Sequence, residues 1–257
     1  MTTFIQLLVS GTTVGAIYAL VAIGFTLVYR ASDVFNLAQG EFFMLGGMIA
    51  GMMLLGGIGG TMGSVVSSLV VTVACGVGLY VLCIRPAKTT NPVQLLIITI
   101  GASVLIRGVV SATLGKDFVR IPNFITPEII NVSGVVIQTQ AVVVIVGAAA
   151  IIGALWFFLS RTAVGKAIVA VSSNDMASRL VGINPAVMIC MCFGISALIG
   201  AVGGLVATPI TMTSYDAGTM LAVKGFAAAM LGGMGTPVGP LAGGLIIGLL
   251  EAFGAGY

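Results

Sequence analysis

Long, continuous apolar runs separated by short polar stretches make up most of the chain. A bilayer core about 30 Å thick requires roughly 20 apolar residues in a spanning helix. On that basis the sequence predicts membrane segments at 4–29, 35–55, 62–84, 93–114, 140–159 and 186–209, and a last apolar region at 221–253. The runs do not alternate with polar residues, which excludes a transmembrane β-barrel. The expected fold is all-α, a polytopic transmembrane helical bundle of about seven membrane segments.

The last apolar region is interrupted by the sequence GGMGTP at residues 232–237. Glycine and proline end helices, so this region is predicted to form a short apolar segment followed by a helix over 240–253. Residues 221–236 either cross the bilayer or re-enter it from one side. Non-helical backbone at membrane depth survives only where protein buries it or water lines it. A broken or re-entrant piece is therefore expected here.

Lysine and arginine are unevenly distributed between the predicted loops. Three loops on one side carry Arg30, Arg85, Lys88, Arg161, Lys166 and Arg179. The opposite side has mainly residues 115–139, where Lys116 and Arg120 are offset by Asp117 and Glu128. Because cytoplasmic loops carry the excess of basic residues, the N-terminus is expected outside. The first residues lack a positively charged stretch, so we expect no cleavable signal peptide.

The composition agrees with a membrane protein. Of 257 residues, 59% are hydrophobic and 7% are charged, whereas soluble domains average about 25% charged. The net charge of +3 is small and scattered, so nucleic acid is not an expected partner. The four cysteines lie inside apolar runs and are expected to be small buried hydrophobes.

Glycine is very frequent, with 37 residues. In membrane helices glycine lets two backbones approach closely. Spacings of the GxxxG type occur at Gly11/Gly15, Gly47/Gly51, Gly200/Gly204, Gly239/Gly243 and Gly244/Gly248. Each pair either marks a helix contact or arises by chance from the glycine content.

The sequence lacks the groups that most catalytic sites use. It has no histidine, the commonest acid–base group and metal ligand. Around Gly165 and Lys166, Ser160 stands where a phosphate-binding loop needs its first glycine, and Ala167 stands where it needs serine or threonine. We therefore expect no enzyme activity, no cofactor and no metal site in this chain.

Polar residues gather where the first apolar run gives way to the second. In residues 29–47, YRASDVFNLAQGEFFMLGG, the side chains of Asn36, Gln39 and Glu41 lie beside or within an apolar stretch. Polar and ionisable groups at membrane depth are costly and usually face a pathway or a partner. Asn36 and Gly40 are four apart, which places them on one face if a helix runs through both. These four residues are candidates for a substrate pathway at a broken helix; a solvated cytoplasmic turn is the alternative.

Two basic residues, Arg107 and Lys224, fall inside or at the start of apolar runs. Both are candidates to line a pathway. The alternative, which we favour slightly, is that each long stem extends to the headgroups and keeps its charge in water. Glu251, near the end of the chain, is expected at the interface.

Residues 160–185 form a polar stretch on the predicted cytoplasmic side. Residues 172–175, SSND, offer helix-capping side chains, Gly182 a stop, and Pro185 a block to continuation. A short helix over 175–181 is therefore predicted within this loop. We interpret it as a docking element; a plain linker is the alternative.

Several segments resemble LivH-type permeases, the membrane subunits of bacterial ABC importers for branched-chain amino acids. The resemblance covers GTTVGAIYALVAIGFTLVY (11–29) with FNLAQGEFFMLG (35–46), and SRTAVGKA (160–167) with NDMASRLVGIN (174–184). It ends with KGFAAAMLGGMGTPVGPLAGG (224–244). The matches follow in order along nearly the whole chain, which is expected to be one permease domain, 1–257.

The resemblance implies a division of labour in the bacterial inner membrane. The expected partners are two cytoplasmic ABC ATPases, a second, paralogous permease subunit, a periplasmic binding protein and the lipid bilayer. Residues 160–185 correspond to the family's cytoplasmic coupling loop. The resemblance assigns contact with the ATPase to Asn174, Asp175, Ala177, Ser178, Arg179 and Gly182. It places Asn36, Gln39 and Glu41 near the pathway, with Gly40 and Lys224 as further candidates.

Two departures from the family pattern qualify this interpretation. The family often has histidine where this chain has Gln39, so the solute could instead be urea, an amide or a small aromatic acid. The family also continues beyond the position of Tyr257 into one more helix and a basic tail.

Two other functions remain open from the residues alone. An ion-coupled secondary transporter or channel is one, although the four central predicted segments hold no carboxylate for coupling by protonation. A structural membrane subunit without a path is the other.

Overall fold

The computed structural model describes residues 2–87, 91–123, 125, 129–132, 135–235 and 238–256. Lys88, Glu128 and residues 236–237 of the predicted break lie outside the described residues. In chain order the elements are α1 (Thr2–Ser32), α2 (Gln39–Leu55), α3 (Gly60–Gly78), η1 (Leu79–Ile84), η2 (Arg85–Ala87), α4 (Pro92–Thr113), β1 (Ile129–Val132), β2 (Val135–Gln138), α5 (Thr139–Arg161), α6 (Ala163–Ser173), α7 (Asp175–Leu180), α8 (Pro185–Thr211), α9 (Ala217–Gly232) and α10 (Val238–Gly256).

The described chain is a helical bundle, which confirms the predicted class. Six of its helices are long and apolar enough to cross a membrane: α1, α3 with its continuation to Ala87, α4, α5, α8 and α10. The apolar helices α2, α6 and α9 are shorter. The two strands β1 and β2 form an antiparallel hairpin within residues 115–139, the stretch predicted to lie on the side opposite the basic loops.

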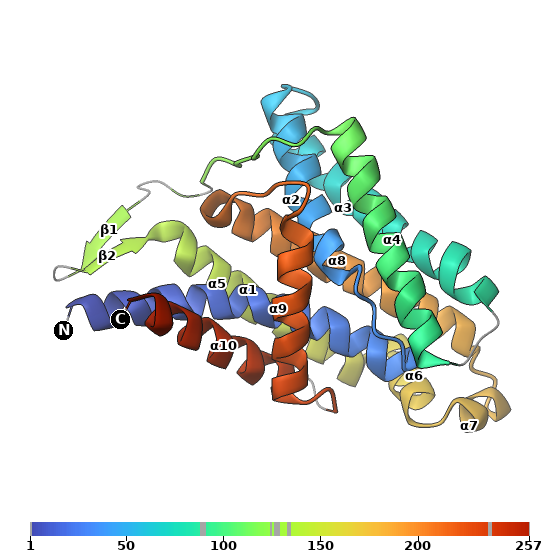
Figure 1. Cartoon of the computed structure of the whole chain (residues 1–257). Helices are drawn as coiled ribbons and strands as arrows, with labels where there is room; N and C mark the ends of the chain where they lie inside the picture. Colours follow the sequence, from blue (N-terminus) through green and yellow to red (C-terminus); the bar gives the residue numbers. More distant parts are fainter. Residues whose placement is uncertain are drawn as a thin grey trace.

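Helix α1 is the centre of the bundle. Every residue from 15 to 28 is buried, as expected for a helix that is apolar on all sides. It contacts α5, α8, α9 and α10. Figure 1 shows α10 lying beside α1, with the two chain ends close together, and α9 crossing in front of both.

Glycines allow the close approach of α1 and α10. A Cβ atom added to Gly15 would lie 2.8 Å from the Leu245 Cα, and one added to Gly244 would lie 2.5 Å from the backbone nitrogen of Ala19. Gly11 and Gly248 make equally close backbone contacts with the opposite helix. The Gly11/Gly15 and Gly244/Gly248 pairs therefore lie at one shared helix contact, the first of the two alternatives left open by the sequence.

Two of the remaining GxxxG pairs, Gly200/Gly204 and Gly239/Gly243, also lie at contacts between helices. Gly200 and Gly204 of α8 face the backbone of Phe42 and Phe43 on α2. Gly243 of α10 faces the carbonyl of Ala228 on α9. Several pairs thus bring backbones together, which explains why the chain tolerates so many glycines.

Two segments differ from the sequence prediction. Residues 34–38, expected inside the second membrane helix, are non-helical, and α2 begins only at Gln39. Helix α9 begins at Ala217, not near 221, because Gly218 packs tightly against Gly40 of α2 and so belongs to the helix interface.

Candidate functional site

The non-helical segment at 34–38 enters the bundle beside α4. The Thr99 hydroxyl donates to the carbonyl of Phe35 at 3.0 Å and accepts from the amide of Leu37 at 3.3 Å. The Asn36 Oδ1 atom accepts from the amide of Ala38 at 3.2 Å, a local turn that Asn side chains favour. These contacts satisfy backbone groups that a helix would otherwise pair. Because 34–38 is not helical, Asn36 and Gly40 do not share a helix face, and that prediction is wrong.

Asn36 is fully buried, with 0% of its surface exposed. Its Nδ2 atom has no hydrogen-bond partner in the described part of the chain. Burying an amide without a hydrogen-bond partner costs free energy. The Nδ2 group is therefore available to a ligand or to water.

Gln39 joins three helices at the start of α2. Its Nε2 atom donates to the carbonyl of Ser196 on α8 at 3.1 Å, and its Oε1 lies 2.5 Å from the Ser196 hydroxyl. The same hydroxyl lies 2.9 Å from the carbonyl of Gly24 on α1. A side chain on Gly24 would collide with the Gln39 amide. Gln39 therefore has its polar atoms occupied and holds the start of α2 against α1 and α8.

Gly40 lets α2 and α9 touch. A Cβ at this position would collide with the carbonyl of Gly218 and lie 2.7 Å from the backbone nitrogen of Ala222. Glycine is needed here for the close approach of two backbones.

Glu41 follows directly and faces α4 and α9. Its carboxylate is completely buried, and Oε1 accepts from the Ser103 hydroxyl at 2.8 Å and the Thr219 hydroxyl at 3.4 Å. The Arg107 Nε lies 3.4 Å from the same oxygen, at ion-pair distance but without hydrogen-bond geometry. The second oxygen, Oε2, has no hydrogen-bond partner among the described residues.

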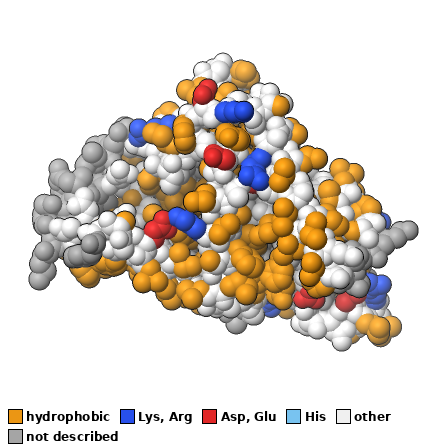
Figure 2. Space-filling view, viewed as in Figure 1, with side chains coloured by type: hydrophobic (Ala, Val, Ile, Leu, Met, Phe, Trp, Pro, Cys, Tyr) orange, Lys and Arg blue, Asp and Glu red, His pale blue; other side chains and the backbone are white. Residues whose placement is uncertain are grey.

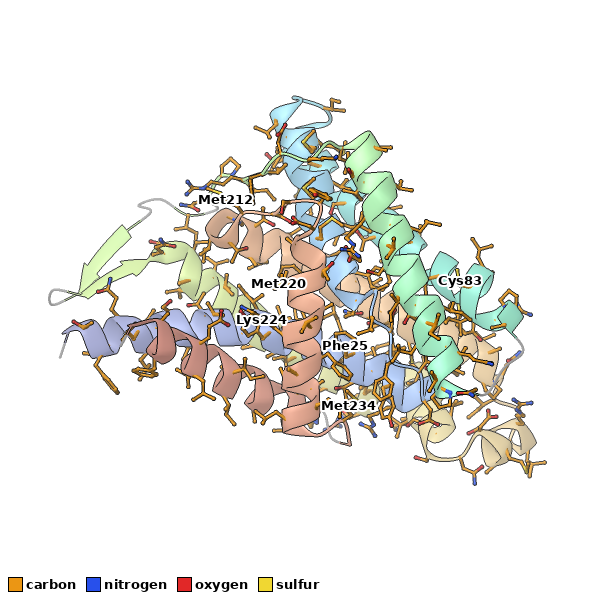
Figure 3. All side chains as sticks on the ribbon, viewed as in Figure 1. Phe25, Cys83, Met212, Met220, Lys224 and Met234 are labelled. Atoms are coloured by element: carbon orange, nitrogen blue, oxygen red, sulfur yellow. The ribbon has the colours of Figure 1, made fainter. Side chains whose placement is uncertain are left out.

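Lys224 lies midway along α9, where this helix crosses α1 (Figure 3). Its ammonium group contacts the Glu251 Oε1 of α10 at 2.5 Å and the Tyr18 hydroxyl of α1 at 2.9 Å. The Tyr18 hydroxyl in turn donates to the Glu251 Oε2 at 2.7 Å. Three residues from three helices thus form one closed polar cluster.

Both long basic side chains pair inside the chain and do not extend alone to the headgroups. The snorkelling alternative is therefore wrong for Lys224 and Arg107, and Glu251 is part of an ion pair. Figure 2 shows acidic and basic side chains adjacent to one another on an otherwise apolar and neutral face. The partners Tyr18, Ser103 and Thr219 could not be predicted from the sequence, since hydroxyls within apolar runs carry no distinctive pattern.

The candidate pathway residues do not converge on one point. Gln39 is directed toward α1 and α8, whereas Glu41 is directed toward α4 and α9. Lys224 lies on α9, five residues after Thr219, the α9 contact of Glu41. Helix α9 is thus the element that connects the two charged clusters.

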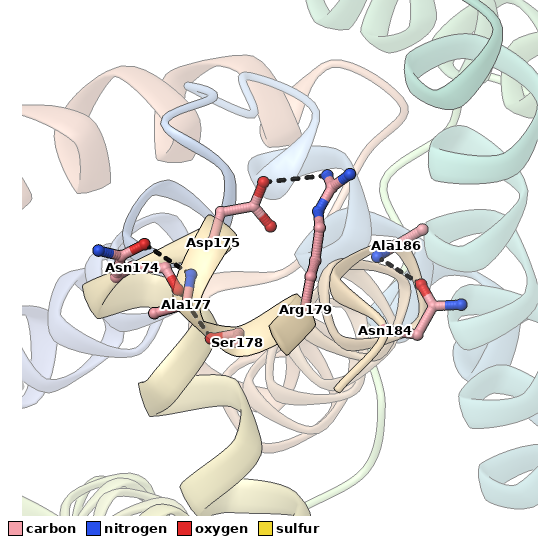
Figure 4. Close-up of polar contacts among 7 residues, drawn as sticks. All are labelled: Asn174, Asp175, Ala177, Ser178, Arg179, Asn184 and Ala186. Atoms are coloured by element: carbon pink, nitrogen blue, oxygen red, sulfur yellow. Dashed lines mark hydrogen bonds and ion pairs between the residues drawn. The ribbon is translucent and has the colours of Figure 1, made fainter. Parts of the chain in front are cut away.

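Helix α7 is the short helix predicted at 175–181 (Figure 4). Asn174 Oδ1 accepts from the amide of Ala177 at 2.9 Å and caps the helix. Asp175 and Arg179 form an exposed ion pair at 3.0 Å. Ser178 is buried and its hydroxyl donates to the carbonyl of Asn174 at 2.8 Å. Gly182, with φ of 83°, ends the helix.

The outward face of α7 is apolar, which the sequence analysis did not anticipate. Met176, Leu180 and Val181 have 76%, 86% and 74% of their surfaces exposed. The four-residue spacing of Met176 and Leu180 in a capped helix could have indicated this face. A cavity of about 550 Å³ separates α7 from the bundle and is lined by Arg30, Asp33, Tyr80, Pro92 and Arg179, among others.

Comparison with known proteins decides the family. The model of the family described as "Branched-chain amino acid transport system / permease component" matches residues 7–257. The chain belongs to this family. It is a transmembrane permease component without a catalytic role, and a multi-pass membrane protein.

Two relatives match along almost the whole chain. It is 34% identical to the high-affinity branched-chain amino acid transport system permease protein BraD of Pseudomonas aeruginosa, over 98% of this chain and 86% of the relative. It is 32% identical to LivH of Escherichia coli K12, over 99% of this chain and 87% of the relative. The ribose import permease protein RbsC of Haemophilus influenzae is 33% identical over 37% of this chain and 32% of its own length. No solved structure matches.

The ion pair between Lys224 and Glu251 predicts a specific pattern of stabilities. Lys224→Met or Glu251→Gln leaves one charge without its partner and should lower the free energy of unfolding by about 1–3 kcal/mol. The double variant should lose clearly less than the sum of the single losses. Thermal unfolding in detergent measures the stability of the purified parent subunit, the two single variants and the double variant. Asp175→Asn and Arg179→Met form the matched control cycle, with a coupling of about 0–1 kcal/mol for an exposed pair. Equal coupling in the two cycles would contradict the assignment.

Proposed function

We propose that this permease forms part of the transmembrane path for a branched-chain amino acid or a similar small solute. A periplasmic binding protein delivers the solute, and two cytoplasmic ABC ATPases supply the energy. A second, paralogous permease subunit completes the path in the bacterial inner membrane. The observation that carries the proposal is the pair of charged clusters on the two sides of α9, in a chain of this family.

We propose that residues 1–257 are one membrane domain with its N-terminus outside. Arg30, Pro92 and Arg179 line one common cavity, which supports placing the predicted cytoplasmic loops at one end. At 17 and 16 residues, α2 and α9 are about 25 Å long, slightly short of the hydrocarbon core. The non-helical residues 34–38 complete the crossing of α2, and α9 joins α10 through the break after Gly232.

The chemistry of the solute fits the charges on α9. A free amino acid carries an ammonium and a carboxylate, and either charge is costly at membrane depth without a partner. Glu41, with one oxygen unpaired, offers an acceptor for an ammonium group, and Lys224 offers a donor for a carboxylate. Thr219 and Lys224 are about 7.5 Å apart along the axis of α9. Asn36, Gln39 and Gly40 hold the start of α2 in the position that presents Glu41.

The exposed side of α9 is where the second permease subunit is expected. Met220 and Val223 have 66% and 61% of their surfaces exposed beside Lys224. If the path forms between two subunits, the polar clusters lie at the interface between them. If lipid covered Lys224 and Glu251 instead, both charges would be poorly solvated.

We propose that residues 160–185 couple the path to the ATPase. Asn174, Ala177, Ser178 and Gly182 fix the shape of α7, because they cap it, bury one side and end it. Asp175 and Arg179 flank its apolar outward face. A rigid helix presenting Met176 and Leu180 is suited to insertion into a groove on a partner.

A pair of substitutions separates a pathway role of Glu41 from a structural one. In the importer assembled with its ATPases and binding protein, Glu41→Gln should reduce solute uptake about tenfold or more, since a charged contact contributes about 1.5–3 kcal/mol. Adding Arg107→Met removes the cation that Glu41→Gln leaves without its partner. If Glu41 contacts solute, uptake stays low in the double variant while stability recovers. Uptake restored in the double variant would show that the pair of Glu41 and Arg107 is structural. In a separate test, an unchanged transport rate and selectivity in Asn36→Ala would also argue against a pathway at 36–41.

The coupling role predicts that loss of the α7 contact lowers transport and stimulated ATP hydrolysis together. The variant Met176→Ser/Leu180→Ser removes the apolar contacts and should lower both uptake and the ATPase activity that the loaded binding protein stimulates, while the binding protein still binds the permease. Gly182→Ala strains the left-handed backbone and should act in the same direction. Ser173→Ala, an exposed position at the end of α6, serves as control. Uptake at the normal rate in the Met176/Leu180 variant would refute the docking of α7.

A further inference from the structure

Two cavities of different chemistry meet at Trp156 on α5. The first, of about 370 Å³, is lined by Arg30 of α1, Lys166 of α6, and Ser160 and Trp156 of α5. The second, of about 580 Å³, is apolar and lies between α1, α5 and α10. Trp156 borders both and is the single tryptophan of the chain.

The basic side chains of the first cavity are uncommitted. Arg30 and Lys166 make no side-chain hydrogen bond or ion pair with any residue that the structure describes, whereas Lys224, Arg107 and Arg179 all have carboxylate partners. Arg30 is partly buried in the last turn of α1. The cavity therefore presents two positive charges without partners in the described chain to an anionic group. The Ser160 hydroxyl also lines the cavity and donates to the carbonyl of Phe157 at 3.3 Å, so it reaches an anion only by turning from that bond.

The apolar groove runs along the middle of α1 and α5 and the first half of α10. It follows α1 from Thr12 to Ile23, α5 from Ile145 to Trp156, and α10 from Val238 to Leu245. The eleven residue steps from Thr12 to Ile23, or from Ile145 to Trp156, span about 16 Å, close to half of the roughly 30 Å hydrocarbon core. The groove thus extends from Trp156, where it meets the basic cavity, past the middle of α5 to Ile145, six residues after the start of that helix.

We propose that these two cavities form a binding site for an anionic glycerophospholipid of the leaflet on the side of Arg30 and Lys166. The phosphate lies between Arg30, Lys166 and Ser160, and one acyl chain fills the groove between α1, α5 and α10. Basic pockets between membrane helices at this level suit anionic headgroups. Trp156 lies at the boundary between the two, the level that tryptophan occupies in membrane proteins.

The groove wall contains a glycine that provides a direct test. A Cβ at Gly153 would meet no atom within 4 Å, so a larger side chain there enters the groove without disturbing the helix backbone. Gly101 on α4 is equally open and lies outside both cavities, which makes it a matched control.

Quenching of the single tryptophan by brominated lipid measures occupancy of the site. The full-length permease is reconstituted into phosphatidylcholine vesicles containing increasing fractions of dibromo-phosphatidylglycerol or, separately, dibromo-phosphatidylcholine. We expect stronger quenching by the anionic lipid at equal fractions. Arg30→Gln and Lys166→Gln should each reduce this preference about fivefold, because a basic residue near the membrane surface contributes that factor. Gly153→Leu should reduce quenching by both lipids.

The controls separate a site from general attraction to the surface. Arg85→Gln, at another basic position, and Gly101→Leu should leave the preference and the quenching unchanged. Equal quenching by both lipids in the parent protein would overturn the proposal, as would equal effects of Arg30→Gln and Arg85→Gln. Absence of quenching by either lipid would show that protein covers the groove, and would also overturn it.

Discussion

Hydrocarbon offers no hydrogen bonds, so every polar group inside this bundle must be satisfied by another part of the protein. This constraint determines the arrangement around α1. Gln39 holds the start of α2 through Ser196 and the Gly24 carbonyl, and Thr99 satisfies the backbone of 34–38. Lys224 of α9 meets Glu251 of α10 and Tyr18 of α1. Each polar contact joins different helices, and glycines bring those helices close enough for the contacts to form.

The same constraint identifies the groups that remain incompletely paired. One oxygen of Glu41 and the Asn36 amide are buried without partners in the described chain. Both lie at or next to the break before α2, where backbone geometry departs from the helix. Incompletely satisfied polar groups at a break in a membrane helix are where a solute with two charges finds contacts. Helix α7 connects to this region through a single helix, since α8 begins at Pro185, shortly after α7, and carries Ser196, the partner of Gln39.

Much of the architecture could be predicted from the sequence, because long apolar runs have one stable form in a bilayer. The short helix α7 was predictable as well, since Asn174 and Gly182 act locally on neighbouring residues. The GxxxG spacings indicated contacts but not partners, since which helix meets which depends on the whole bundle. The pairing of Lys224 with Glu251 and Tyr18 joins residues far apart in sequence, and no local pattern reveals it. The sequence indicated a broken helix or a turn within 29–47, but not that 34–38 is the non-helical part, because the apolar residues there continue the hydrophobic run.

The central claim is that the face of α9 beside Lys224 lines a water-accessible path. The direct measurement is thiol labelling in the importer, with the four native cysteines of this chain replaced and one cysteine introduced at a time. Met220→Cys and Val146→Cys are matched, since the native side chains are 66% and 61% exposed in the single chain. A thiol reacts as the thiolate, which forms in water and not in lipid. The account predicts that a charged, membrane-impermeant reagent labels position 220 during transport, that the solute slows this labelling, and that position 146 stays unlabelled. Labelling at neither position, or labelling at 220 that solute leaves unchanged, would contradict it.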